Sequence, residues 1–321
     1  MPVRTLLSVL LLGMLGVSEA AAQIARVELH PIATTTPTDQ QFLTGDRSAP
    51  AVTIAGELRI PRSTTQRLPV VVLLHGSGGV ANNVATWAQE LNSAGIAVFI
   101  VDAFTGRGLV GTSDDQDRLS RLAHVVDAYR ALAILLRHPR IDPERIFLMG
   151  FSRGGGAAHW AAIQRFRDLY GPPADAEFAG FISVYGTCNR RFVDEVRVVN
   201  RPIRYLHGLA DDYVPAAECE ALAARLRVAG GNATFTGYPN AHHVFDDPAL
   251  PASLRQPRVH VSTGCDIAEA PDGRLIDRKT GQSFAYASAP CVSRGATIGS
   301  NEEARRAALE AARALVLAPA R

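Results

Sequence analysis

The sequence predicts an α/β fold in which a doubly wound, mostly parallel sheet is flanked by helices. Two observations support this prediction. Several short segments are apolar without interruption, such as "LPVVVLLHG" at 68–76 and "IAVFIVDAF" at 96–104. Runs of this kind are typical of parallel strands that are covered on both faces. Segments with helical spacing separate these strands, and this alternation indicates a parallel sheet with helical crossovers.

The predicted elements follow one another regularly along the chain. Strands are predicted at 51–60, 68–76, 96–104, 145–150, 179–186, 201–208 and 233–239, the last of these being the final strand. Helices are predicted at 83–94, 116–138, 153–167, 216–228 and 302–317.

Two segments do not fit this alternation. Residues 23–50 are polar, with the Thr-rich stretch "ATTTPTDQ", and are predicted to be an irregular lead-in. Residues 246–300 are rich in Pro, Gly, Ser and Thr and are predicted to be a long insertion. No linker divides the remainder, so residues 51–321 are expected to form a single domain that includes this insertion.

Composition limits the classes of partner. The chain has 321 residues, of which 47% are hydrophobic, so it can bury a large core. Its 33 basic and 31 acidic residues give a net charge of +2, and no basic run is present. We therefore expect binding neither to nucleic acid nor to an anionic membrane surface. Composition does not indicate an oligomeric state.

The first 22 residues have the pattern of a secretory signal. Met1 to Arg4 are a short positive start, Leu6 to Val17 are almost entirely apolar, and Ala20 to Ala22 are small. The apolar run is shorter than the roughly 20 residues that a membrane span needs. We therefore predict a cleaved signal peptide at 1–22, rather than a retained anchor or a buried helix, and an exported protein that is periplasmic or secreted.

Cysteine usage agrees with export. The four cysteines are even in number, and their wide spacing fits no common zinc pattern. In an oxidising compartment they are expected to form two disulfides. Sequence alone leaves three pairings open among Cys188, Cys219, Cys265 and Cys291.

A glycine-rich turn surrounds one serine. Gly150-Phe151-Ser152-Arg153-Gly154 fits the G-x-S-x-G pattern between a predicted strand and a predicted helix. In that context the glycines make room for a sharp turn that exposes the Ser152 hydroxyl. The start of the helix also directs free N–H groups toward a developing oxyanion. The pattern predicts that Ser152 is a nucleophile.

An acid and a base follow this serine in the appropriate order. Asp211 and Asp212 follow one predicted strand, and His242 and His243 follow the next. A serine nucleophile needs an imidazole to accept its proton and a carboxylate to orient that imidazole. Chemistry alone leaves the choice within each pair open. Five other histidines are expected to be surface or packing residues: His30, His124, His138, His159 and His260.

The loop "HGSGG" at 75–79 follows the first fully apolar strand. In this architecture the loop supplies a second hydrogen-bond donor to the oxyanion. We therefore predict an oxyanion hole formed by the backbone N–H groups of Ser77 and Arg153. His75 is expected to be structural. The Arg153 side chain is expected either to bind a substrate carboxylate or to form a salt bridge at the sheet edge.

The chain resembles the dienelactone hydrolase family of the α/β-hydrolase superfamily. The resemblance rests on "VVLLHGSGG", "HPRIDPERIFLMGFSRGG", "HGLADDYVP" and "YPNAHHVFD", and it covers roughly residues 51–245 plus the C-terminal helix. It implies the α/β-hydrolase fold. The family patterns H-G-x-x-D-x-x-V-P and Y-P-x-A-x-H-x-F imply that Asp211 is the acid and His243 the base.

The resemblance also bears on the nucleophile and the disulfides. Dienelactone hydrolases use cysteine as nucleophile, whereas this chain has Ser152, as secreted esterase-like relatives do. That difference weakens the inference of a lactone substrate. Similarity to exported relatives implies a Cys188–Cys219 disulfide, which leaves Cys265–Cys291 to staple the insertion.

These observations predict a secreted serine hydrolase that cleaves carboxylic esters or lactones through an acyl-enzyme. Its partner would be a small-molecule ester, and no metal or organic cofactor is expected. A peptidase or amidase is the alternative on the same fold, although the extra domain such enzymes usually carry is not evident before Ser152. A non-catalytic binding protein is the alternative from another class, although it would have no need of a complete Ser, Asp, His and oxyanion set.

Overall fold

Eight strands form the central sheet of the computed structural model, which describes residues 24–63, 66–172 and 176–319. The strand order is β1-β2-β4-β3-β5-β6-β8-β9. In this order, each neighbouring pair from β4 through β3, β5, β6 and β8 to β9 is parallel. The two remaining pairs, β1 with β2 and β2 with β4, are antiparallel. The strands are β1 (Ile24–Thr35), β2 (Ala51–Pro61), β3 (Leu68–Leu74), β4 (Ala97–Asp102), β5 (Ile141–Phe151), β6 (Gly180–Val184), β8 (Ile203–Gly208) and β9 (Ala233–Tyr238).

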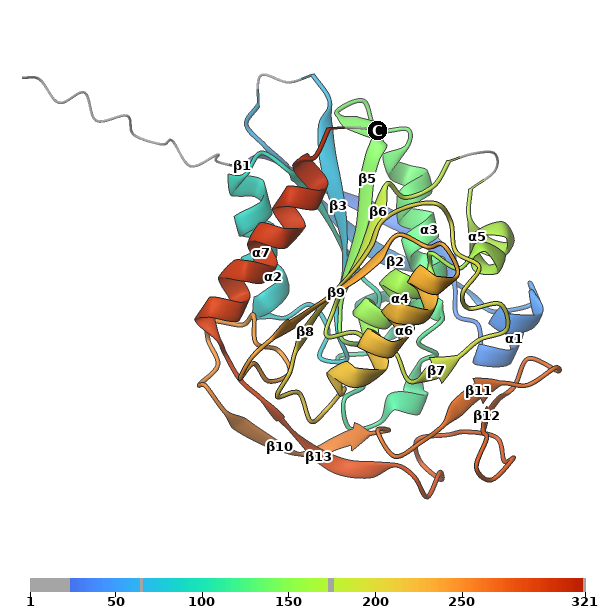
Figure 1. Ribbon diagram of the computed structural model, residues 1–321. Helices are drawn as coiled ribbons and strands as arrows, with labels where there is room; N and C mark the ends of the chain where they lie inside the picture. The colour runs from blue at the N-terminus through green and yellow to red at the C-terminus, as the bar shows by residue number, and fades with distance from the viewer. Residues whose placement is uncertain (1–23, 64–65, 173–175, 320–321) are drawn as a thin grey trace, which may run out of the picture.

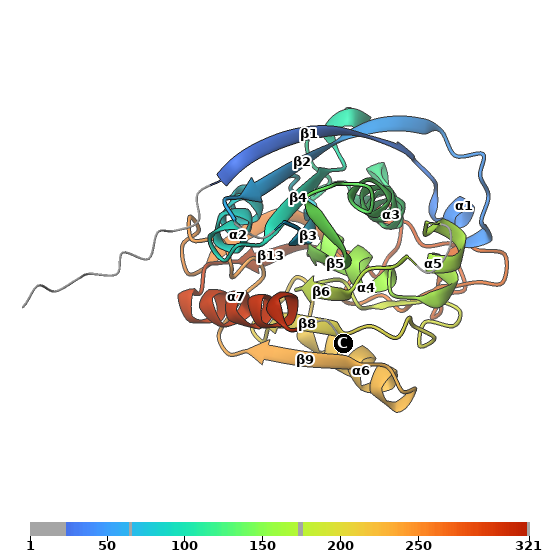
Figure 2. The same ribbon diagram turned by 90° about the horizontal axis from the view of Figure 1, so that it is seen from above.

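Helices cover both faces of this sheet, as Figure 2 shows. On one face lie α2 (Asn82–Ser93) and α7 (Glu302–Leu317), where Trp87 and Leu309 share a buried apolar cluster with Leu73 of β3. On the other lie α3 (Ala123–Leu135), α4 (Arg153–Trp160), α5 (Gln164–Tyr170) and α6 (Ala216–Val228). Every residue of β3 is buried, which explains its unbroken apolar sequence.

The N-terminal segment is more regular than the sequence predicted. The expected irregular lead-in at 23–50 is wrong, because β1 pairs with β2 along its whole length and α1 (Asp39–Thr44) follows it. The alternation of inward and outward side chains in β1 is hidden in the sequence, because the polar residues Glu28 and His30 point inward while the apolar residues Val27 and Leu29 are exposed. The predicted signal peptide at 1–22 lies outside the described residues. Within the described ranges, no helix has the length and apolar character needed to cross a membrane.

Two predicted helices are interrupted by tertiary contacts. The helix expected at 116–138 is a short turn, η2 (Gln116–Arg118), followed by α3, because the carbonyls of Gln116 and Leu119 accept hydrogen bonds from the Arg153 guanidinium. The helix expected at 153–167 divides into α4 and α5. At that break, backbone bonds join Ala162 and Gln164 to the 197–199 segment.

The insertion at 246–300 contains strands that the sequence did not predict. β10 (Leu254–Val261) pairs with β13 (Ser293–Ile298), while β12 (Leu275–Asp277), β11 (Ile267–Glu269) and the short β7 (Arg190–Arg191) form a third sheet. These strands lie along the lower rim of the molecule in Figure 1. The prediction that 233–239 is the last strand is therefore wrong. A further short helix, η1 (Thr105–Arg107), follows β4.

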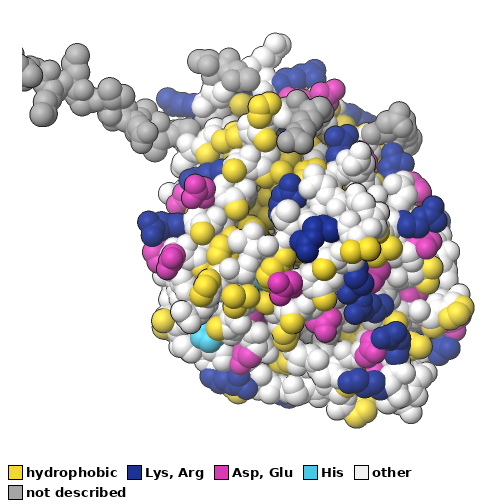
Figure 3. Space-filling view, viewed as in Figure 1, with side chains coloured by type: hydrophobic (Ala, Val, Ile, Leu, Met, Phe, Trp, Pro, Cys, Tyr) yellow, Lys and Arg dark blue, Asp and Glu magenta, His cyan; other side chains and the backbone are white. Residues whose placement is uncertain are grey.

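Charged side chains of both signs are interspersed over the face of the molecule in Figure 3. This distribution agrees with the small net charge of +2. The face drawn offers no large single-sign surface for a polyanion.

Two disulfides are present. Cys188, in the loop after β6, is joined to Cys219 on α6, and Cys265 is joined to Cys291 within the insertion. Cys188 and Cys219 are both buried and lie 31 residues apart in sequence. The first bond therefore ties the end of a central strand to the helix that follows β8.

Replacing Cys188 and Cys219 together with alanine is expected to destabilise the protein. In the chain-entropy model, a disulfide across a loop of this size contributes about 3–4 kcal/mol. Calorimetry of the double variant measures the loss. An unchanged Tm would contradict this expectation.

Candidate active site

Ser152 lies at the turn between β5 and α4, at the carboxyl edge of the parallel strands. Its φ of 52° and ψ of −111° are strained for a residue with a side chain. The flanking glycines permit this turn through close backbone contacts. A Cβ on Gly150 would lie 2.1 Å from the Gly154 carbonyl oxygen, and a Cβ on Gly154 would lie 2.3 Å from that of Leu74. Any larger residue at either position would displace the backbone that holds Ser152.

A chain of hydrogen bonds connects Ser152 to two other residues. His243 Nε2 lies 2.9 Å from Ser152 Oγ, and His243 Nδ1 lies 2.7 Å from Asp211 Oδ2. Asp211 follows β8 and His243 follows the neighbouring β9. Parallel strands bring their carboxyl ends to one edge, which is why residues so distant in sequence meet here. The arrangement can pass a proton from the hydroxyl to the imidazole.

Asp211 is held in place by its own partners. The backbone N–H groups of Tyr213 and Val214 donate to its Oδ1 at 2.9 and 2.8 Å, and His207 Nε2 lies 3.4 Å from its Oδ2. Burial alone would raise the pKa of Asp211, but the charges and hydrogen bonds of His243 and His207 lower it below its usual value. Asp211 is therefore ionised at neutral pH, as a carboxylate that orients an imidazole must be.

The neighbours of Asp211 and His243 point elsewhere. Asp212 is exposed, pairs with Arg255 at 3.1 Å and accepts a hydrogen bond from the Thr297 backbone at 2.7 Å. His242 Nδ1 bonds to the Ala210 carbonyl at 2.9 Å. Asp212 therefore ties the insertion to the loop after β8, and neither residue joins the chain that ends at Ser152.

The two predicted oxyanion residues flank this serine. Ser77 lies in the loop after β3, where a Cβ on the preceding Gly76 would be 3.4 Å from Ser152 Cβ. Arg153 is the first residue of α4, so its backbone N–H has no acceptor within the helix. Ser77 and Ser152 also line the same cavity.

The Arg153 side chain is held by hydrogen bonds inside the fold. Its guanidinium is fully buried and donates to the carbonyls of Leu119 and Gln116 at 2.8 and 3.1 Å and to Gln116 Oε1 at 2.7 Å. The salt bridge considered from sequence is wrong, since these acceptors are neutral and no carboxylate in the described ranges pairs with this group. Burial, followed by the charge of Arg121, lowers its pKa well below the usual value.

His75 joins the loop after β3 to the loop after β4. Its Nε2 accepts a hydrogen bond from the Ala103 backbone at 3.1 Å, so Nδ1 carries the hydrogen that is donated to the Gly76 carbonyl at 2.8 Å. Burial lowers the pKa of His75 to about 4. The imidazole therefore remains neutral at physiological pH and keeps both hydrogen bonds.

A cavity of about 190 Å³ opens beside Ser152. The sequence predicts pocket walls in residues 104–117, around Trp160 and in the 246–300 insertion, and Gln116 and Tyr286 of this lining come from two of those segments, whereas Trp160 is not part of it. Tyr213 belongs to the "HGLADDYVP" motif and could have been found there, whereas Arg121 carries no recognisable signal. His260, expected to be a surface or packing residue, lines the cavity and stacks on Tyr286 with ring centroids 5.9 Å apart. The insertion thus contributes directly to the site.

Two arginines lie beside Tyr286 in the cavity wall, which also includes Glu218. Arg121 Nη2 donates to Tyr286 OH at 2.8 Å, and the Arg190 guanidinium lies 5.9 Å from the Tyr286 ring centre. Burial would raise the pKa of Tyr286, but the charges of Arg121 and Arg190 lower it to about 8. The phenol can therefore titrate close to physiological pH.

Comparison with known proteins agrees with this architecture. A model of the dienelactone hydrolase family matches residues 54–258. Esterase LipQ of Mycobacterium tuberculosis is 27% identical in an alignment of 268 positions that covers 70% of this chain and 60% of LipQ. The chain thus spans less than two thirds of the length of that relative.

Solved structures with the same fold are more distant in sequence. The structure titled m3DLH has a TM-score of 0.58 at 19% identity and covers 90% of this chain and 97% of its own. A dienelactone hydrolase-like promiscuous phosphotriesterase from metagenomic libraries has a TM-score of 0.58 at 17% identity, with the same coverage. These likenesses confirm the predicted α/β-hydrolase fold.

Proposed function

The chain belongs to the dienelactone hydrolase family, and from this we propose that it hydrolyses carboxylic esters with Ser152 as nucleophile. The observation that carries the proposal is the hydrogen-bond chain from Ser152 through His243 to Asp211, with distances of 2.9 and 2.7 Å. The curated relative LipQ, named an esterase, supports the same class of reaction.

The reaction follows from these positions. As Ser152 Oγ attacks the ester carbonyl, its proton passes to His243 Nε2, and Asp211 stabilises the imidazolium that forms. The backbone N–H groups of Ser77 and Arg153 bind the carbonyl oxygen as it becomes negative. His243 then gives its proton to the leaving alcohol, which leaves an acyl group on Ser152. Water attacks this acyl-enzyme with His243 as base, and the acid is released.

A fluorophosphonate probe tests the nucleophile directly. We expect one covalent adduct per chain, located on Ser152 by peptide mass spectrometry, because only an activated serine reacts readily. The Ser152→Ala variant should not be labelled. A folded protein that resists the probe would favour a non-catalytic binding protein, and an adduct on another serine would contradict the assignment of Ser152.

Arg121 in the cavity wall favours an ester that carries an acidic group. Arg121 lines the cavity, and its Nε has no hydrogen-bond partner among the described residues. A buried donor of this kind is costly unless a ligand satisfies it. A carboxylate on the substrate would provide both the acceptor and the opposite charge.

Substrate affinity is therefore expected to depend on Tyr286. As the pH rises through about 8, Tyr286 ionises and neutralises part of the Arg121 charge. KM for an ester with a free carboxylate should rise several-fold over that range, while KM for its neutral methyl ester should not. Steady-state kinetics of wild type and Tyr286→Phe across pH 7–9 measure this, and the rise in KM should be absent in the variant. Equal pH profiles for the two esters would contradict the proposed acidic substrate.

We also propose that the protein is exported to the periplasm or secreted. The disulfides Cys188–Cys219 and Cys265–Cys291 support this, since such bonds persist in oxidising compartments. The N-terminal sequence of protein recovered from the export compartment tests it, with Gln23 as the expected first residue.

A further inference from the structure

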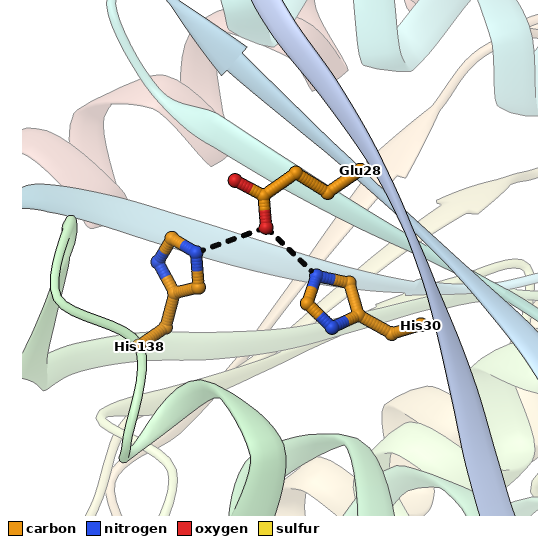
Figure 4. Close-up of side chains that lie close together, drawn as sticks. All are labelled: Glu28, His30 and His138. Atoms are coloured by element: carbon orange, nitrogen blue, oxygen red, sulfur yellow. Dashed lines mark hydrogen bonds and ion pairs between the residues drawn. The ribbon is translucent and has the colours of Figure 1, made fainter.

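Three side chains converge at β1, the edge strand of the central sheet. Glu28 and His30 lie on β1, and His138 lies in the loop between α3 and β5 (Figure 4). The Nε2 atoms of His30 and His138 each lie 3.1 Å from the same oxygen, Glu28 Oε2. The side chains are 14%, 22% and 10% exposed for Glu28, His30 and His138, so the cluster is largely buried yet open to solvent.

The backbone explains this convergence. Residues 28 and 30 are two apart on a strand, so both side chains lie on the same face of the sheet. That face is the one covered by α3, whose C-terminal end leads into the loop bearing His138. The rings of His30 and His138 lie at 80° to each other with centroids 6.1 Å apart. Both rings thus direct a nitrogen toward one point from different directions.

We propose that Glu28, His30 and His138 form a binding site for a divalent cation of the zinc class. Two imidazole nitrogens and one carboxylate oxygen are ligands that zinc prefers. Metal–ligand distances of 2.0–2.2 Å in a tetrahedron require ligand atoms roughly 3.3–3.5 Å apart. The three ligand atoms lie within 4.8 Å of one another, and two of their separations are 3.1 Å. Small side-chain adjustments would therefore admit the ion, and water would complete the coordination.

Two neighbouring residues, Arg26 and Arg140, affect how the cluster would bind a cation. Arg26 Nε forms an ion pair with Glu28 Oε1 at 2.9 Å, while Glu28 Oε2 faces the two histidines. The Arg26 charge opposes a cation, but this side chain is 70% exposed and its effect is screened by solvent. The Arg140 backbone N–H donates to His138 Nδ1 at 3.3 Å, a long bond that the metal-bound ring would give up.

The position of the cluster assigns it a structural role. His138 precedes β5, whereas Ser152 follows it, and the strands β2, β4 and β3 separate β1 from β5 in the sheet. A bound ion would join β1, the edge strand of the sheet, to the loop before β5. It would hold the N-terminal strand in place without taking part in ester hydrolysis.

Equilibrium dialysis against Zn²⁺ and titration with Co²⁺ test this proposal. The full-length protein should bind Zn²⁺ at this site, with a Tm that rises as Zn²⁺ is added. Co²⁺ should give the intense visible absorption of a four- or five-coordinate ion. His30→Gln and His138→Gln should each weaken binding at least tenfold. Because zinc could instead bind the histidine beside Ser152, His243→Gln is the matched control and should retain the high-affinity site.

The outcomes separate the alternatives. Zinc binding that is lost only in His243→Gln, or that is equal in wild type and both cluster variants, would overturn the proposal. A Co²⁺ spectrum like that of the hydrated ion would overturn it as well, and this measurement needs only the wild-type protein. Far-UV circular dichroism without metal establishes that each variant is folded before its affinity is compared.

Discussion

Ser152→Ala is expected to lower kcat/KM for a short p-nitrophenyl ester by roughly a millionfold. The variant lacks the oxygen that would attack the carbonyl, while His243 and Asp211 retain their 2.7 Å hydrogen bond. The amides of Ser77 and Arg153 would remain as well, so a small residual rate above the uncatalysed reaction is expected. Steady-state kinetics with saturating and limiting ester measure the loss.

Ser93→Ala is the matched control. Ser93 lies at the exposed end of α2, where its hydroxyl donates to the Gln89 carbonyl at 2.9 Å. The Ser93→Ala variant loses a serine Oγ, as Ser152→Ala does, but at a position remote from the proposed active site. Its rate of ester hydrolysis should therefore stay close to that of wild type. If Ser152→Ala kept activity within tenfold of Ser93→Ala, the proposed nucleophile would be wrong.

Asp211→Asn is expected to lower kcat by about 10⁴-fold. The asparagine is nearly isosteric, but it cannot stabilise the imidazolium and can hold His243 in the wrong tautomer. Because the pKa of Asp211 in the folded protein is below its usual value of 3.8, its ionised form stabilises the fold at higher pH. That contribution is lost as the pH falls through the folded-state pKa, so the variant should also be less stable than wild type at neutral pH.

Asp212→Asn separates the two adjacent carboxylates. Asp212 pairs with Arg255, and both side chains are about half exposed, so this pair contributes at most about 1 kcal/mol. The variant should keep most of its activity and lose little stability. Similar losses of kcat in Asp211→Asn and Asp212→Asn would contradict the role proposed for Asp211.

The candidate site could be read from the sequence only in part. The G-x-S-x-G turn singled out Ser152, because few other functions require glycines on both sides of one hydroxyl. The adjacent residues at 211–212 and 242–243 could not be separated by chemistry, since each pair offers two identical functional groups. Side-chain direction separates them in the structure, where His243 bonds to both Ser152 and Asp211 while Asp212 bonds to Arg255.

The fold, like the site, could be predicted from the sequence only in part. Strands such as β3 were evident because burial on both faces requires an unbroken apolar sequence. β1 was missed because its inward face carries Glu28 and His30, whose partner His138 lies 110 residues away from Glu28. The break between α4 and α5 was missed because the competing hydrogen bonds come from residues 197–199.

The sequence by itself determined the layered sheet, the strained turn at Ser152 and the order in which acid and base follow it. Each of these depends on local requirements: apolar periodicity, glycine at close backbone contacts, and residues at the ends of strands. Only the tertiary structure decided the wall of the cavity, where Arg121 meets Tyr286 from the insertion, and the cluster formed by Glu28, His30 and His138. The Glu28–His138 and Arg121–Tyr286 contacts join residues 110 and 165 positions apart, and no local pattern in a single sequence records which distant residue will meet a given side chain.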